Sequence, residues 1–405
     1  MGDNQSLLDT VLQKAKALWP ELLEWRRHLH ENPELSFQEY KTQAWLREKL
    51  GEMGIECHPV AETGLWGILK SEDAGEEEPV FWLRADMDAL PIHENEEKPC
   101  VSHNPGVMHA CGHDVHSACL LGALNILKQL RLSWHGKVGF VFQPGEEVLP
   151  GGASLVVSSG LFTSFSNLGM AALHVSPELD AGYLGFAEGP FMASSDEIYL
   201  TFEGPGGHGA LPHLSADTLL AAASTLVILQ QVASRRAPTA TPTILSFGRC
   251  TAPGAPNVIP SKVELAGTFR TLDEAWRREA HQHIRRIAEQ TAAAHSVSLT
   301  CEIRQGYPVL VNDPELTHHV RAAMASLFGA EKIVELKPRM TSEDFSFYGS
   351  QMPVCLFRLG TGGPEHQYRH SVHTPRFDIH PEALFYGAAA LAWAALSNLN
   401  AGRKP

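Results

Sequence analysis

The sequence predicts an α/β protein: a mainly parallel, doubly wound domain with a second, ferredoxin-like α+β domain inserted into it. Three observations support this prediction. Strand-like apolar runs alternate with helical segments in the first half of the chain. Between about residues 194 and 304 the order changes to β-α-β-β-α-β, the order of a ferredoxin-like domain. After residue 304 the alternation of strands and helices resumes. In addition, 405 residues are too many for one ordinary hydrophobic core.

Apolar periodicity and turn residues predict the elements of the first domain. In chain order these are a helix over 7–30 that Pro20 breaks or restarts, a helix over 36–53 ending at Gly54, strands at 65–70 and 80–85, a helix over 117–130, strands at 137–142 and 171–175, helices and strands from Pro314 onward, and a closing helix over 381–399.

The same signals define the inserted domain. Its predicted elements are a strand at 198–202, a helix over 216–234, strands at 243–249 and 262–270, a helix over 273–293 and a strand at 296–303. We therefore expect residues 1–193 and 305–405 to form the first domain and residues 194–304 the insertion. A cleft between two such domains is the natural place for a substrate.

Composition excludes several classes of function. The chain is 44% hydrophobic and 19% charged, which is typical of a globular protein, and its net charge of −14 argues against nucleic-acid binding. No run of about 20 apolar residues could span a membrane. The N-terminal MGDNQSLLDT lacks the features of a signal peptide, and the seven scattered cysteines resemble reduced thiols, so we expect a cytoplasmic protein.

The densest group of reactive side chains is the segment 108–116, MHACGHDVH. It holds three imidazoles, a thiol and a carboxylate, and thiolates and imidazoles are ligands that zinc and neighbouring metals prefer. Cys111 and His113, with Gly112 between them, can point at one centre from a tight turn. The alternative is that this segment is only a polar loop leading into a helix, with no metal-binding role. Four potential ligands in nine residues favour a metal site.

Glu146 and Glu147 follow an apolar strand and a Pro-Gly turn. Neighbouring residues in a turn point in different directions, so one carboxylate can bind a metal while the other faces a bound water and takes its proton. His174 and His373, each alone, would more often be ordinary core histidines. With Cys111, His113 and Glu147 they make five ligands, more than one tetrahedral zinc needs, which fits a pair of metals sharing a ligand and a water.

Nine segments together make the chain recognisable. They are 26–37 (RRHLHENPELSF), 84–92 (RADMDALPI), 108–116, 142–147 (FQPGEE), 173–175 (LHV), 206–213 (GGHGALPH), 257–260 (NVIP), 340–345 (MTSEDF) and 371–377 (SVHTPRF). In this order they resemble the aminoacylase/carboxypeptidase family of binuclear metallohydrolases. Within this family the chain resembles the branch that contains hippurate hydrolase, N-acyl-L-amino acid amidohydrolases and auxin-conjugate (IAA-amino acid) hydrolases.

The resemblance implies roles for matched positions. Cys111 stands where relatives have a metal-bridging ligand, and His113, Glu147, His174 and His373 complete two metal sites. Glu146 matches the general base and acid that activates the bridging water, and Asp88 matches a carboxylate that orients the metal site.

In the inserted domain, His208 matches a histidine that reaches the cleft of a partner subunit and stabilises the oxyanion. Asn257 and Arg270 lie where relatives hold the substrate carboxylate, for which a guanidinium is well suited. The resemblance thus implies a lid and dimerisation role for this domain, and a homodimer or possible homotetramer.

Other residues match no family role. His109 and His116 flank the metal turn without matching a ligand, and His213, His366 and His370 match none either. Gly145 stands where many relatives carry Ala, and 148–150 (VLP) replaces a Gly-rich run, which puts the acyl-group preference in doubt.

The implied activity is metal-dependent hydrolysis of the amide bond of a small-molecule N-acyl amino acid. It needs two divalent ions per subunit: zinc or manganese, with nickel or cobalt as further possibilities. Three alternatives remain open: a dipeptidase or carboxypeptidase on the same site, a thiol hydrolase with Cys111 as nucleophile and His113 as base, and a non-enzymatic metal-binding protein.

Overall fold

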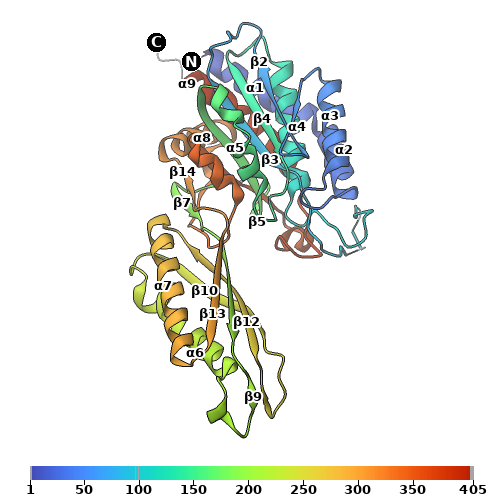
Figure 1. Cartoon of the computed structure of the whole chain (residues 1–405). Helices are drawn as coiled ribbons and strands as arrows, with labels where there is room; N and C mark the ends of the chain where they lie inside the picture. Colours follow the sequence, from blue (N-terminus) through green and yellow to red (C-terminus); the bar gives the residue numbers. More distant parts are fainter. Residues whose placement is uncertain (1, 96, 99, 402–405) are drawn as a thin grey trace. The chain divides into compact units, whose positions relative to one another are not determined.

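The chain forms two compact units in the computed structural model, which describes residues 2–95, 97–98 and 100–401 (Figure 1). The larger unit contains the chain up to Gly189, Val311–Lys337 and the chain from Asp344 onward. The smaller contains Pro190–Leu310 and Pro338–Glu343. The smaller unit thus extends beyond residues 194–304 by a few residues at each end, and the short segment 338–343 joins it.

An eight-stranded sheet forms the centre of the larger unit, in the order β1-β2-β4-β3-β5-β16-β6-β15. Its four middle strands β4, β3, β5 and β16 run parallel, while β2 and β6 flank them antiparallel. The prediction of a mainly parallel sheet is confirmed. The strands are β1 (His58–Val60), β2 (Gly64–Lys70), β3 (Val80–Asp86), β4 (Lys137–Gln143), β5 (Asn167–Asp180), β6 (Leu184–Phe186), β15 (Ile333–Glu335) and β16 (Val354–Gly362).

Layers of helix cover both faces of this sheet. On one face, Phe81 and Leu83 of β3 belong to the same apolar core as α4 and α9. On the other, the ring of Trp82 meets Phe162 and Arg84 bonds to Asp344. The helices are α1 (Gly2–Ala17), α2 (Trp19–Glu31), α3 (Tyr40–Glu52), α4 (His113–Gln129), α5 (Gly152–Ser158), α8 (Pro314–Phe328) and α9 (Ala383–Ala401). None of the helices described here is long and apolar enough to cross a membrane.

Several elements differ by a few residues from their predicted bounds, and three of these differences concern the segments around the site and the N-terminal helices. The helix predicted over 7–30 restarts near Pro20 as expected: α1 and α2 meet at Leu18, and Pro20 lies in the first turn of α2, where a missing N–H costs nothing. Helix α4 begins at His113 and not at residue 117, because Gly112 with φ +82° closes the preceding turn. Strand β5 runs from 167 to 180, so His174 lies within a strand and not at its end.

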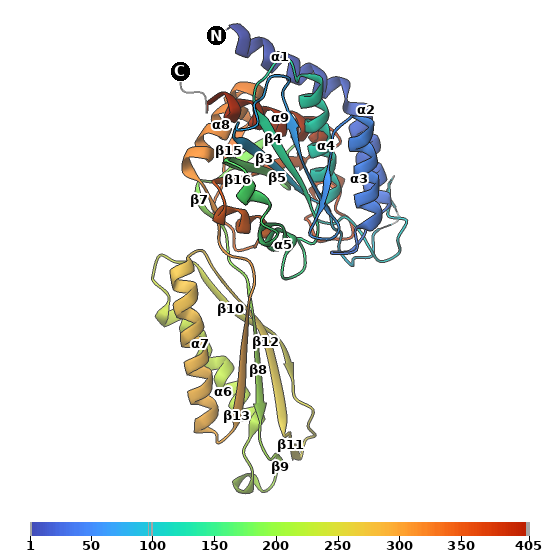
Figure 2. The same ribbon diagram turned by 45° about the horizontal axis from the view of Figure 1, so that its top comes forward.

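The smaller unit is a four-stranded antiparallel sheet in the order β10-β12-β8-β13, with α6 and α7 sharing its apolar core (Figure 2). This arrangement confirms the ferredoxin-like prediction. Its elements are β8 (Asp196–Glu203), α6 (Thr218–Gln231), β10 (Thr243–Thr251), β12 (Lys262–Thr271), α7 (Glu274–Ala294) and β13 (Ser298–Gln305). A small ribbon of β9 (Gly207–His208) and β11 (Val258–Ile259) follows β8 and precedes β12.

Candidate metal centre

The turn before α4 places Cys111 and His113 on the same side. Gly112 takes a left-handed conformation with φ +82°, and a Cβ there would meet Val175 Cγ2 at 2.6 Å. Only glycine therefore fits between the two potential ligands. Both ligand side chains are buried at the carboxyl-terminal edge of the parallel strands, where α/β proteins bind ligands.

Two groups of potential metal ligands share Cys111. One contains Cys111, His113 and His174; the other contains Cys111, Glu147 and His373; within each, the ligand atoms lie within 4.8 Å of one another. All five predicted ligands are thus brought together, although they come from four separate segments of the larger unit. A thiolate belonging to both groups could ligate an ion in either of them.

The distances suit metal ligation. Cys111 Sγ lies 3.5 Å from His174 Nε2 and 3.2 Å from His373 Nε2, and His373 Nε2 lies 3.2 Å from Glu147 Oε1. Sulfur and nitrogen ligands bound to one tetrahedral zinc at about 2.3 and 2.0 Å are separated by about 3.5 Å. The side chains could therefore receive ions with small movements.

In His113 and in His174, one ring nitrogen makes a hydrogen bond, which leaves the other nitrogen free to bind a metal ion. His113 Nδ1 bonds to Asp88 Oδ1 at 3.1 Å, and His174 Nδ1–H donates to the Val175 carbonyl at 2.9 Å. Metal-binding histidines are usually held by such a bond. His113 Nε2 is buried without a hydrogen-bond partner among the described residues, as expected of a group whose partner is an ion.

Asp88 ties the metal ligands to the turn that carries the two glutamates. Besides His113, its carboxylate accepts the Glu147 backbone N–H at 3.0 Å and the Ser36 hydroxyl at 2.6 Å. The turn is also held by Glu39, whose carboxylate accepts the Gly145 N–H at 2.8 Å. Asp88 thus contacts both His113 and the turn that carries Glu146 and Glu147.

The Glu146 carboxylate lies close to the same candidate ligands. A carboxylate oxygen of Glu146 lies within 4.8 Å of ligand atoms of His113 and Glu147, and the residue is 7% exposed. The Asp344 backbone N–H lies 3.4 Å from Glu146 Oε1 and directs the carboxylate. Glu146 is therefore near the ligands without belonging to either group that contains Cys111.

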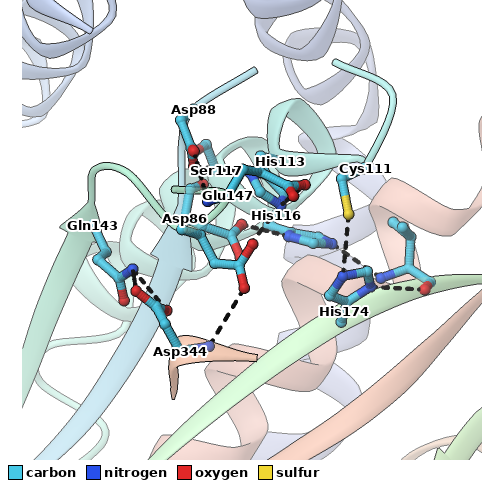
Figure 3. A network of polar contacts seen from close by, with 12 residues as sticks. Asp86, Asp88, Cys111, His113, His116, Ser117, Gln143, Glu147, His174 and Asp344 are labelled. Carbon is cyan, nitrogen blue, oxygen red and sulfur yellow. Dashed lines mark hydrogen bonds and ion pairs between the residues drawn. The ribbon is translucent and has the colours of Figure 1, made fainter. Parts of the chain in front are cut away.

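A second layer of buried polar groups supports this centre, among them His116, which flanks the predicted ligands in the sequence without matching one (Figure 3). Asp86 Oδ1 lies 2.6 Å from His116 Nδ1, and the Val175 N–H donates to His116 Nε2 at 3.0 Å. Both nitrogens of His116 are thus occupied, so it holds the strand beside His174 in place. The pair Asp86 and Asp88 at a strand end, and the segment MTSEDF containing Asp344, were the available sequence signals.

Burial and neighbouring charges decide which of the candidate ligands carry a proton when no ion is bound. Burial lowers the pKa of His113, but Asp86 and Asp88 outweigh it and raise the pKa to about 10. Burial raises the pKa of the Cys111 thiol well above its usual range, and Glu147 and Glu146 add to that shift. Burial and the neighbouring Arg358 lower the pKa of His174, so this imidazole stays neutral.

Metal affinity should therefore rise with pH. Cys111 and His113 both carry protons at neutral pH, and both must lose them to ligate an ion. We expect the apparent dissociation constant to fall by about 10- to 100-fold per pH unit between pH 6 and 9, since one or two protons are displaced. Calorimetric titration in buffers with different ionisation enthalpies would count these protons. A dissociation constant that does not change with pH would contradict this assignment.

The remaining predicted residues lie in the smaller unit. His208 and Asn257 come together, because His208 pairs with Val258 and the Gly209 N–H donates to the Asn257 carbonyl at 2.8 Å. Arg270 lies at the other end of β12, where its guanidinium bonds to the Met340 carbonyl and the Ser342 hydroxyl at 3.3 and 3.2 Å. The structure therefore does not bring Asn257 and Arg270 together within this unit.

Comparison with known proteins places the chain in a family. Residues 82–397 match the model of peptidase family M20/M25/M40. The chain belongs to this family. An N-acyl-L-amino acid amidohydrolase of Geobacillus stearothermophilus is 40% identical over 73% of this chain and 79% of its own length. An IAA-amino acid hydrolase (ILR1-like 4) of Arabidopsis thaliana is 36% identical over 90% of this chain and 82% of its own.

A solved structure supports the same assignment. A Bacillus subtilis protein described as a dinuclear metal-binding peptidase of family M20 superposes with a TM-score of 0.81 at 33% identity, covering 95% of this chain and 99% of its own. The family predicted from the sequence motifs is confirmed. The chain is accordingly a hydrolase of amide bonds, and the alternative of a non-enzymatic metal-binding protein is not supported.

Proposed function

We propose that the protein hydrolyses the amide bond of N-acyl amino acids at a centre of two divalent metal ions. The observation that carries this proposal is the pair of ligand groups sharing Cys111, with the carboxylate of Glu146 beside them. His113 and His174 would hold one ion with Cys111, and Glu147 and His373 the other. Bound ions supply a Lewis acid for the amide carbonyl and lower the pKa of the attacking water.

The side chains of the larger unit divide the remaining work. Glu146 takes the proton from the attacking water and delivers it to the leaving amine, held in direction by the Asp344 N–H. Asp88 fixes the orientation of the His113 imidazole through its bond to Nδ1. Neither role requires Glu146 or Asp88 to ligate an ion.

We assign substrate contacts to the smaller unit: Arg270 and Asn257 for the substrate carboxylate, and His208 for the oxyanion. Because Arg270 lies at the opposite end of the sheet from the other two, one copy of this unit could not easily supply all three to one substrate. A homodimer in which His208 and Asn257 serve the partner's site accounts for this separation. The exposed apolar side chains of α6 support such an interface, among them Leu219, Leu220 and Val227.

The thiol-nucleophile alternative has little physical support. A nucleophilic cysteine needs a depressed pKa, whereas burial and the two glutamates raise the pKa of Cys111. The metal is zinc or manganese on the chemistry of the donor set, with nickel or cobalt as further candidates. The seven free cysteines suit a cytoplasmic location.

The proposal is tested by the release of free amino acid from N-acetyl, N-benzoyl and longer-chain acyl amino acids, beside a set of dipeptides, with added manganese or zinc. We expect metal-dependent turnover of acyl amino acids that a chelator abolishes. Turnover of dipeptides alone would favour the dipeptidase or carboxypeptidase alternative. No turnover of either the acyl amino acids or the dipeptides, by protein with two ions bound, would contradict the proposed substrate class.

A further inference from the structure

His373 differs from the other ligands in how it is held. Cys111 lies just before α4 and His113 is its first residue, His174 lies within strand β5, and Glu147 lies in the short turn after β4. His373 lies in an irregular segment, with its side chain 51% exposed and its backbone in the left-handed region at φ +62°. Its position must therefore be determined by contacts from other segments.

The His373 N–H itself donates to the Ala110 carbonyl at 2.8 Å, and a second link, from α2, holds Asp378 in the same segment. The Arg26 guanidinium donates through Nε to Asp114 Oδ2 at 2.9 Å and through Nη2 to Asp378 Oδ1 at 3.0 Å. Asp114 is the neighbour of His113 at the start of α4, whereas Asp378 belongs to the segment that carries His373. The Arg26 side chain, which is 11% exposed, thus connects the segment that carries His113 with the segment that carries His373.

The rest of the network fixes the same segments. His30 bonds through Nδ1 to Asp114 and through Nε2 to Glu94, each at 2.8 Å. Burial and the charge of Arg26 lower the pKa of His30, but its two carboxylate partners raise it above the ordinary value, so the imidazole can donate through both nitrogens. Lys98 bonds to Glu94 and to the Phe377 carbonyl, next to Asp378.

Such a cluster is unusual in a protein interior. Its three cations, Arg26, His30 and Lys98, balance three carboxylates, Glu94, Asp114 and Asp378, and most of these groups are buried. A buried ion network gains little stability over apolar packing because of the cost of desolvation, but it can impose one geometry. A ligand in an irregular segment, such as His373, needs contacts of this kind to fix its position.

We propose that Arg26 is a positioning residue that sets the affinity of the metal site containing His373, by holding Asp378 at a fixed distance from α4. The proposal rests on the two-ion centre of the proposed function. It gives a role to part of the segment RRHLHENPELSF, which contributes no predicted ligand. It also predicts that the site containing Cys111, His113 and His174 depends less on Arg26, since helix and strand hold those ligands.

The test is a metal titration, read by competition with a chromophoric chelator and independent of activity. Wild type should bind two manganese or zinc ions. In Asp378→Ala and in Arg26→Gln, one ion should bind with wild-type affinity and the second about 10- to 100-fold more weakly, as is typical when an outer contact to a metal site is lost. Arg26→Lys should be intermediate, since one ammonium replaces a two-pronged donor.

Arg27→Gln is the matched control, because Arg27 is the neighbouring arginine on the same helix and is exposed. It should leave both affinities unchanged. Arg26→Gln leaves Asp114 partly unpaired and could fail to fold, in which case Asp378→Ala decides. Equal affinities in variant and wild type, or an equal loss at both sites, would overturn the proposal. Fewer than two ions on the wild type would contradict the two-ion centre instead.

Discussion

Glu146→Gln should lower kcat by about 10²- to 10⁴-fold, the usual contribution of general acid–base catalysis. The amide keeps the size of the side chain and can still face the Asp344 N–H with its oxygen, but it cannot take a proton. Because proton transfer occurs only in the transition state, kcat and kcat/KM should fall together while KM changes little. Steady-state rates on the best N-acyl amino acid would measure this.

The neighbouring glutamate provides the matched control. Glu147→Gln removes a ligand from the group that contains Cys111 and His373, so its loss of activity should come with weaker metal binding. Glu146→Gln should retain both ions. If Glu146→Gln lost an ion, its carboxylate would be a ligand and the proton-transfer role would have to pass to another residue. If its activity were unchanged, the assigned base would be wrong.

The sequence predicted the elements near the centre better than their bounds. Periodicity identified α4 only from residue 117, because the polar side chains of His113, Asp114 and His116 interrupt the apolar stripe that marks a helix. In the structure these residues are buried against one another and against Asp86, Asp88 and Arg26. A buried polar face has no signature in a pattern of apolar residues.

The five candidate ligands, which the structure brings together, could be named from the sequence because each stands in a recognisable local motif. Asp88 could be named in the same way, but the pairings of more distant supporting residues could not: Asp344 is 198 residues from Glu146, and Asp378 is 352 residues from Arg26. Strand β16, which runs parallel to β5 and places Arg358 beside His174, also went unidentified as a separate element. Pairings of this kind depend on the fold as a whole and not on local spacing.

Cys111→Ala should have the largest effect on metal binding, because Cys111 is the one residue in both ligand groups. Each group would keep only two ligands, and two ligands bind a divalent ion weakly. We expect fewer than one tightly bound ion per chain, measured by elemental analysis after dialysis, and activity below detection. The fold should persist, since the exchange removes one buried sulfur from a site that is already polar.

Cys111→Asp separates the loss of a bridge from the loss of a thiol. A carboxylate has two oxygens and can also contact two ions, so this variant should bind two ions, with a preference moved from zinc towards manganese because oxygen is the harder ligand. Activity should return in part with manganese. Full metal occupancy in Cys111→Ala would show that the thiolate does not bridge, and the other four ligands would then have to form two sites on their own.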